Sequence, residues 1–323
     1  MSDYPHPDPV VRTGNARELA RDLVVVPNEG VQLVPNIGLV GGTEAVLVVD
    51  TGMGPANAGK VLELATDYAA GRRIYLTTTH FHPEHAFGAQ TFAGHATYLL
   101  NRAQATDLAG KGPGYLQMFR GLGAPVAAQL EGVELATPDL VYDTDHELDL
   151  GGRVVRMSAT GRAHSTGDQV VTVPDAGVMF TGDLVETGQF AIFPWFPPHD
   201  TDVSGTRWIT VLERLAAQAP TVVVPGHGDV GGPRLLADVA DYLRLLRDET
   251  WRRKDSAVGE QTIIEEVRAL MTERHPDWAG QEWIEPGVGC LCAEHDTLTA
   301  AEQAADDTDP ARPTADTDPA RRQ

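Results

Sequence analysis

Short apolar runs separated by turn residues dominate the N-terminal part of the chain. The Val-rich runs predict strands, and groups such as Pro27-Asn28-Glu29-Gly30 and Gly41-Gly42-Thr43 between them favour turns. The predicted strands cover residues 23–26, 31–34, 37–40 and 45–49. A Pro-rich, polar arm comes before them, with a short helix expected over residues 16–23. We therefore expect the chain to begin with a sheet of strands in hairpin order.

Helical and strand-like patterns alternate after this sheet. Apolar residues at helical spacing predict a helix from Ala56 to Tyr68, and Gly71 ends it before a buried strand over residues 74–79. Further helices are predicted over residues 83–92, 103–120, 204–218, 233–253 and 260–274. Further strands are predicted over residues 140–142, 154–158, 169–173, 178–181 and 221–224. Strands mixed with helices in this way predict an α/β fold with the helices outside the sheets.

The composition changes at the C-terminal end. From Ala300 the chain consists mainly of Ala, Asp, Thr, Pro and Arg, and it repeats the sequence Thr-Asp-Pro-Ala-Arg at residues 308–312 and 317–321. Such a segment has little to bury, so we expect a disordered tail over residues 300–323. The other expected parts are an N-terminal arm over 1–22, a catalytic domain over 23–254 and a helical appendage over 255–299.

The composition indicates a globular protein, and the charge narrows its partners. Hydrophobic residues make up 42% and charged residues 22%, which suffices for a full core. The net charge of −21 disfavours nucleic acid and anionic membrane surfaces as partners, and leaves a small-molecule substrate. The N-terminus lacks the pattern of a signal peptide and no apolar stretch has transmembrane length, so we expect a cytoplasmic protein. Cys290 and Cys292 are too close together for a mutual disulfide.

A histidine-rich motif follows one of the predicted buried strands. His80 and His82 are two residues apart, so in extended backbone both side chains point the same way and can share one ion. Pro83 suits the first position of a helix, which would place Glu84 and His85 in the first helical turn. Imidazoles and carboxylates are ligands that zinc and related divalent metals prefer. The motif therefore predicts a metal site, although Glu84 alone could simply favour the helix N-terminus.

Three more candidate ligands stand just past the ends of other predicted strands. They are His164, Asp183 and His227, and each lies beside a glycine or within a glycine-rich turn. Each residue alone would be ordinary in a turn. Because side chains that leave neighbouring strands at one sheet edge can converge, the three together with the histidine-rich motif predict a shared metal centre.

With these motifs, and with Pro35-Asn36-Ile37-Gly38 and Asp50-Thr51-Gly52, the chain resembles the metallo-β-lactamase-fold hydrolase superfamily over roughly residues 23–250. The resemblance implies an αββα sandwich with a metal site along one edge of the paired sheets. It implies two metal ions, with zinc as the expected metal and iron or manganese as alternatives. The ligands that it implies are His80, His82 and His164 for the first ion and His85 and His227 for the second, with Asp183 bridging both.

Glu84 departs from the pattern of this superfamily, which usually has Asp at that position. Glutamate is one methylene longer than aspartate. It either reaches the second ion through a shifted backbone, binds it weakly, or leaves the ion and transfers protons instead. We therefore expect the second metal site to have a lower affinity for its ion, to hold a different metal or to be empty in the isolated protein.

The expected chemistry is hydrolysis. A divalent ion lowers the pKa of a bound water to about 7 and so supplies hydroxide at neutral pH. We expect this metal-bound hydroxide to cleave an ester, thioester, lactone or amide bond of a small, partly apolar substrate, with Glu84 or Asp183 passing a proton to the leaving group. The alternative is a non-haem iron or manganese oxidoreductase on the same fold, because a carboxylate-richer site suits those metals.

An aromatic, Pro-containing loop beyond Asp183 is the first candidate for substrate contacts. The expected contacts are Phe190, Phe193, Trp195, Phe196 and His199. The alternative is a loop packed over the core. The Gly-rich stretch 110–123 is a weaker candidate, as a lid over the site. Trp278 and Trp283 are expected to be packing anchors, and the group of Cys290, Cys292 and His295 is expected to be incidental.

Overall fold

Two β-sheets lie face to face in the computed structural model, which describes residues 6–307 and, of 299–307, only the main chain. The first sheet has the strand order β1-β2-β3-β4-β5-β6-β7 and the second has the order β12-β11-β10-β9-β8. The first sheet consists of β1 (Arg17–Ala20), β2 (Leu23–Val26), β3 (Ile37–Gly41), β4 (Ala45–Val49), β5 (Arg73–Thr77), β6 (Thr97–Asn101) and β7 (Leu140–Tyr142). The second consists of β8 (Asp145–Asp149), β9 (Val154–Ala159), β10 (Gln169–Val173), β11 (Val178–Glu186) and β12 (Val222–His227).

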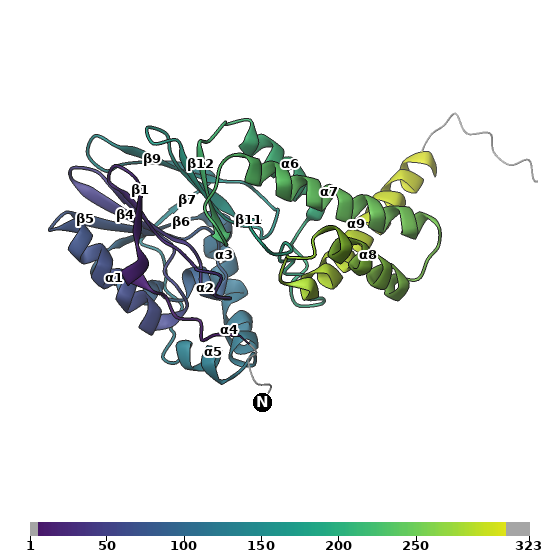
Figure 1. The fold of residues 1–323 in the computed structure, drawn as a ribbon, viewed down its shortest axis with the longest axis horizontal. Helices are drawn as coiled ribbons and strands as arrows, with labels where there is room; N and C mark the ends of the chain where they lie inside the picture. The colour runs from purple at the N-terminus through teal and green to yellow at the C-terminus, as the bar shows by residue number, and fades with distance from the viewer. Residues whose placement is uncertain (1–5, 308–323) are drawn as a thin grey trace, which may run out of the picture.

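Helices cover both outer faces of the paired sheets. Figure 1 shows α1, α4 and α5 on one side and α6 and α7 on the other, with α8 and α9 beyond them. The first group consists of α1 (Gly54–Ala69), α2 (Pro83–Ala86), α3 (Arg102–Gly110), α4 (Gly112–Arg120) and α5 (Ala124–Gln129). The second consists of α6 (Gly205–Ala216), α7 (Arg234–Asp255), α8 (Glu260–Arg274) and α9 (Ile284–Asp307). Short 3-10 helices lie at Thr13–Asn15, Ala89–Phe92 and Gln281–Trp283.

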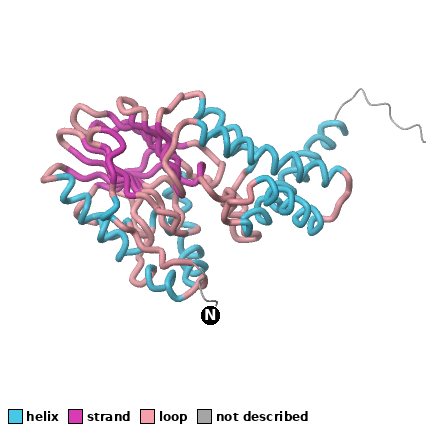
Figure 2. Tube along the Cα trace, in the orientation of Figure 1, coloured by secondary structure: helices cyan, strands magenta, loops and turns pink. Residues whose placement is uncertain are grey.

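The arrangement of two sheets between two layers of helices follows from the alternation of side chains along the strands. Leu47 of β4 lies in the apolar cluster between the two sheets together with Phe180 of β11. Its neighbour Val48 points to the opposite face and joins the cluster that contains Val61 of α1. Because both faces of each sheet are buried in this way, β3, β4 and β11 are buried along their whole length. The predicted αββα sandwich is confirmed (Figure 2).

The C-terminal helices share a core with the second sheet. Leu184 of β11, Trp208 of α6 and Val288 of α9 belong to one buried cluster. Helix α9 continues to Asp307 and so enters the segment expected to be a tail, while residues 308–323 and 1–5 lie outside the described residues. The division into an arm, a catalytic domain, an appendage and a tail stays a prediction. No helix within residues 6–307 is long and apolar enough to cross a membrane.

Two of the predicted elements are wrong. Residues 16–23 form no helix, because Arg17–Ala20 pairs antiparallel with β2 and Asp22 turns the chain at a φ of 54°. Arg17 and Glu18 of this edge strand are both exposed, so the strand lacks the alternation of buried and exposed positions by which a strand is recognised in a sequence. Residues 31–34 form no strand, because Leu33 has a left-handed φ of 58° that an extended strand does not allow. The predicted helix over 103–120 is interrupted at Lys111, and strands β6 and β8 were not predicted.

Candidate metal centre

The histidine-rich motif lies where β5 passes into α2. His80 and His82 lie in the loop after β5, and His82 is the extended residue that precedes the first turn of α2. Pro83 occupies the start of this helix, as predicted, and carries Glu84 and His85 into the same turn. The four side chains are buried. The backbone thus changes from extended to helical within six residues, so the imidazoles of His80, His82 and His85 approach one site from different directions.

The three other candidate ligands come from the second sheet and reach the same edge of the sandwich. His164 lies in the loop after β9, and His227 is the last residue of β12. Asp183 was expected just past its strand, but β11 continues to Glu186 and Asp183 lies within it. It follows an irregularity at Gly182, where the pairing of β11 with β12 changes register. That irregularity directs the side chain of Asp183 to the edge.

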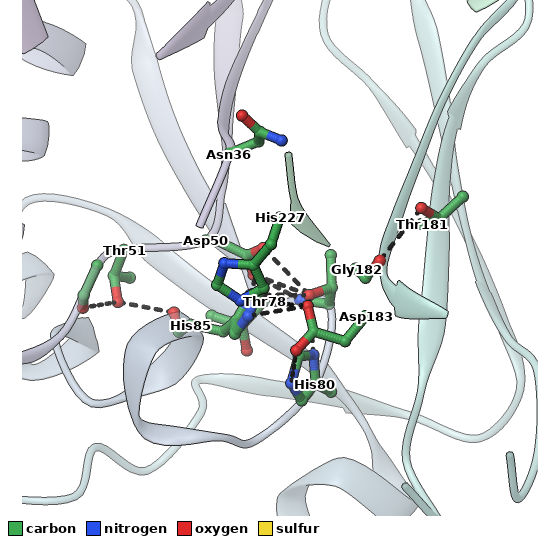
Figure 3. A network of polar contacts seen from close by, with 12 residues as sticks. Asn36, Asp50, Thr51, Thr78, His80, His85, Thr181, Gly182, Asp183 and His227 are labelled. Carbon is green, nitrogen blue, oxygen red and sulfur yellow. Dashed lines mark hydrogen bonds and ion pairs between the residues drawn. The ribbon is translucent and has the colours of Figure 1, made fainter. Parts of the chain in front are cut away.

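Asp183 lies between two groups of histidines (Figure 3). Its Oδ2 is 3.6 Å from Nε2 of His80 and 4.0 Å from Nε2 of His164. Its Oδ1 is 3.2 Å from Nε2 of His85 and 3.6 Å from Nε2 of His227. Within each group the donor atoms lie within 4.8 Å of one another, and the groups are His80, His82, His164 and Asp183, and Glu84, His85, Asp183 and His227. The structure thus brings together all seven candidate ligands.

The donor atoms in these groups have no hydrogen-bond partner among the described residues. They are Nε2 of His80, His82, His85, His164 and His227, Oε2 of Glu84 and Oδ1 of Asp183. Burying a polar atom without a hydrogen-bond partner costs free energy, so a cluster of such atoms indicates a bound group that contacts all of them. Imidazole nitrogens and carboxylate oxygens at these separations fit divalent cations such as zinc.

The opposite ring nitrogens of two histidines are held by the protein. Nδ1 of His85 donates to Oδ2 of Asp50 at 3.0 Å, and Nδ1 of His227 donates to the carbonyl of Val34 at 2.9 Å. Asp50 is itself held by the backbone N–H of Thr79 at 2.7 Å. Such contacts fix the orientation of each ring and direct Nε2 toward the centre, where its lone pair can bind an ion once this nitrogen is deprotonated.

The turn that carries His227 is tied to the first sheet. The side-chain amide of Asn36 donates to the carbonyls of Pro225 and Gly228, each at 2.9 Å. Gly226, between them, approaches Asp183 so closely that a Cβ there would lie 1.9 Å from Oδ1. Only glycine allows this approach.

Burial sets the protonation of several groups in the centre. It lowers the pKa of His80 and of His82 well below the ordinary value, and neighbouring histidines lower it further. Both rings are therefore neutral near pH 7, with lone pairs available for coordination. Burial also raises the pKa of Glu84 to about 7.

An apolar cavity of about 360 Å³ opens beside His82, Glu84 and Asp183. We call it the apolar cavity, and its apolar lining consists of Leu33, Tyr115, Met118, Phe119, Leu122, Ile192, Pro194, Phe196 and Trp283. Of the expected substrate contacts, Phe196 lines this cavity and His199 lines the adjoining one.

The other three expected contacts do not line the apolar cavity. Phe190 and Phe193 are fully buried in the core beneath the second sheet, where Phe193 packs on Trp208. Trp195 lines a different cavity, together with Arg162. The aromatic loop is therefore mainly a packed loop, because its bulkiest rings point toward the helices.

Several cavity residues were missed or given another role. Trp283 was expected to be a packing anchor but lines the apolar cavity, whereas Trp278 packs on Phe190 as expected. Met118 belongs to the Gly-rich stretch considered as a lid, and Leu33 to the predicted strand that does not form. The sequence carries no signal that joins these distant segments.

Comparisons with known proteins agree with the fold. Residues 30–227 match the family model of the metallo-beta-lactamase superfamily. The chain is 28% identical over 229 residues to acyl-coenzyme A thioesterase MBLAC2 of Bos taurus, which covers 64% of this chain and 78% of that protein. It is 25% identical over 231 residues to metallo-beta-lactamase type 2 of Bacteroides fragilis, covering 69% and 80%. The solved metallo-beta-lactamase from Pontibacter korlensis has a TM-score of 0.56 at 19% identity, covers 71% of this chain and 98% of its own, and has the same fold.

Proposed function

The chain belongs to the metallo-beta-lactamase superfamily, and on that basis we propose that it is a zinc-dependent hydrolase of a small, partly apolar substrate. The scissile bond is an ester, thioester, lactone or amide. The observation that carries this proposal is the pair of donor groups that meet at Asp183 with their Nε2 and carboxylate atoms unpaired. Two relatives whose names denote hydrolysis of a thioester and of a lactam support the same class of reaction.

Each donor group would hold one ion. We assign His80, His82 and His164 to the first, and Glu84, His85 and His227 to the second, with Asp183 shared. Zinc suits such an imidazole-rich set, and when bound it lowers the pKa of a coordinated water so that hydroxide is available near neutral pH. The longer side chain of Glu84 reaches the second group, because its carboxylate is within 4.8 Å of the other donor atoms there.

The protein's own groups orient the ligands and handle the proton. Asp50 and the Val34 carbonyl fix the rings of His85 and His227. Glu84 lines the apolar cavity as well as belonging to the donor group, so its carboxylate can accept a proton from the attacking water and then donate it to the leaving group of a substrate seated there.

Turnover of acyl probes tests the proposal. The purified protein is assayed with p-nitrophenyl esters, thioesters, lactones and β-lactams, after zinc loading and after chelation. We expect zinc-dependent hydrolysis in at least one class, and a loss of roughly a hundredfold or more in His82→Ala. His95→Ala is the control, because His95 is exposed. Full activity of a metal-free His82→Ala protein would rule the mechanism out.

A further inference from the structure

A second cavity also borders Glu84 and shares Gln32, Leu33, Ile192, Glu282 and Trp283 with the apolar cavity. It has a volume of about 300 Å³, and we call it the amide cavity because Asn28, Gln32, Thr187 and Gln189 give it neutral polar walls. Glu84 lines this cavity as well as the apolar one. The two cavities therefore meet at the candidate metal centre and differ in the chemistry of their walls.

The apolar cavity continues to an apolar rim at the surface. Met118 and Leu122 of the α4 region are 36% and 39% exposed although both are large apolar side chains. Leu33 and Phe119 line the same cavity. A ligand chain that covers these side chains removes apolar surface from water, which stabilises the complex. This wall fits the hydrocarbon part of a substrate.

Positive charge for an anionic substrate is scarce around these cavities. Among the described residues that line them and the adjoining cavity beside Tyr115, Lys111 is the only lysine or arginine. Its Nζ lies 2.7 Å from Asp202, 3.1 Å from Asp200 and 3.5 Å from Asp107. Three carboxylates thus engage this one ammonium group, and the exposed Glu282 adds negative charge to both cavity linings. Apart from the proposed zinc ions, the lysine and arginine cations that would bind a phosphate are therefore not available along the described walls.

We propose that the site takes uncharged acyl substrates, with a hydrocarbon chain in the apolar cavity and a neutral polar leaving group in the amide cavity. This inference rests on the proposed function, because it places the scissile carbonyl beside Glu84 at the junction. Hydrogen-bonding amide and hydroxyl walls suit a leaving group that carries amides or hydroxyls. Phosphorylated leaving groups are disfavoured.

This specificity differs from what the name of the 28% identical thioesterase would suggest for this chain. An acyl-coenzyme A consists of an acyl thioester, a neutral amide-containing pantetheine arm and a phosphorylated nucleotide. The acyl chain and the arm fit the two cavities described here. The phosphates lie at the far end of the arm, beyond the candidate ions, so the rim of the amide cavity would have to contact them.

Two inert thioethers distinguish the contribution of the neutral pantetheine arm from that of the phosphorylated nucleotide. Binding of S-octyl-pantetheine and S-octyl-coenzyme A to the zinc-loaded protein is measured by calorimetry and by tryptophan fluorescence, since Trp283 lines both cavities. We expect the neutral thioether to bind at least tenfold more tightly at low salt, with a smaller difference at high salt. Equal or tighter binding of the coenzyme A thioether, or no binding of either, overturns the inference.

Two variants test the two walls separately. Leu122→Ser should weaken the binding of both thioethers by a similar factor, because it acts on the shared octyl chain. Thr187→Arg places a cation in the amide cavity, because Thr187 lines that cavity and not the apolar one, and should tighten the binding of the coenzyme A thioether alone. If Thr187→Arg leaves both affinities unchanged, the amide cavity does not hold the leaving group and the assignment is wrong.

Turnover distinguishes failure of this inference from failure of the proposed function. Octanoyl-pantetheine and octanoyl-coenzyme A contain the same scissile thioester, and we expect the first to have at least a tenfold higher kcat/KM. Comparable rates would overturn the inference while the hydrolase assignment stands. Thioether binding as expected, with no hydrolysis of any acyl probe, would overturn the hydrolase assignment and leave the ligand class supported.

Discussion

The ring of Tyr115 lies against the ring of His82, with centroids 5.0 Å apart and an angle of 23° between the planes. The Tyr115 hydroxyl donates to Oδ2 of Asp200 at 2.9 Å, and Asp200 is paired with Lys111. Helix α4, the loop after β11 and one candidate ligand are therefore connected through a single side chain. This connection restricts the position of the His82 ring.

Replacing Tyr115 by Phe should cost stability without removing the metal. The ring that contacts His82 stays, while Asp200 loses one hydrogen bond and keeps Lys111. We expect the free energy of unfolding to fall by about 1 kcal/mol, the usual value for one such bond, at unchanged zinc content. Urea unfolding and elemental analysis check this. Loss of zinc in Tyr115→Phe would show that the hydroxyl, not the ring, positions the ligand.

Replacing Gly226 by Ala should disrupt both donor groups at once. The new Cβ would lie 1.9 Å from Oδ1 of Asp183, the residue that the two groups share. We expect zinc content and hydrolysis to fall together. Gly232→Ala is the matched control, because nothing lies within 4 Å of a Cβ at that position. A Gly226→Ala protein with full zinc content would contradict the position assigned to Asp183.

Replacing Glu84 by Gln should weaken one ion and spare the other. Glu84 belongs only to the group with His85 and His227, and Gln keeps its size but removes the charge. We expect the affinity for the second zinc to fall roughly tenfold to a hundredfold, as for other changes next to metal ligands. Calorimetric zinc titration measures both sites, with Glu84→Asp as the variant that keeps the charge. An equal loss at both sites would contradict the assignment.

Asp107 should make the stability of the protein depend on pH. Burial raises its pKa to about 6 from an ordinary value of 3.8, and Lys111 offsets this only in part. A carboxyl group with a raised folded-state pKa stabilises the folded state fully below pH 4, and this contribution is lost as the pH rises through 6. Asp107→Asn should therefore be about 3 kcal/mol more stable than wild type at pH 8, since the shift is about two pKa units and each is worth about 1.4 kcal/mol, and equal to it at low pH.

Urea unfolding of the metal-free proteins at both pH values measures this difference. Asp143→Asn serves as the control, because Asp143 is an exposed partner of Arg102. A difference between wild type and Asp107→Asn that is the same at low and high pH would show that burial of this carboxyl group carries no penalty.

The candidate ligands could be identified from the sequence because the patterns that indicate them are local. His80 and His82 share a direction through their spacing, Pro83 starts a helix, and His164 and His227 lie after or at strand ends. Glu84 could be identified as unusual but not located, since its reach depends on the main chain of α2. The strand prediction over 31–34 was wrong because the left-handed φ of Leu33 leaves no trace in an apolar pattern.

The cavity walls could not be predicted for a different reason. Leu33, Met118 and Trp283 come from three distant segments, and only tertiary packing brings them to one cavity. Conversely, Phe190 and Phe193 lie next to Asp183 in sequence but point into the core. Proximity in sequence to a strand that carries a candidate ligand therefore indicated which loop lies near the site. It did not indicate the direction of each ring, which depends on packing against the helices that cover the second sheet.

The metal content of the purified protein tests the central claim most directly. The protein is equilibrated with zinc, freed of unbound ions and analysed by elemental and native mass spectrometry, beside an Asp183→Asn variant. The two donor groups predict two zinc ions per chain in the wild type and loss of at least one in the variant. A folded wild-type chain that retains no divalent metal would contradict the account.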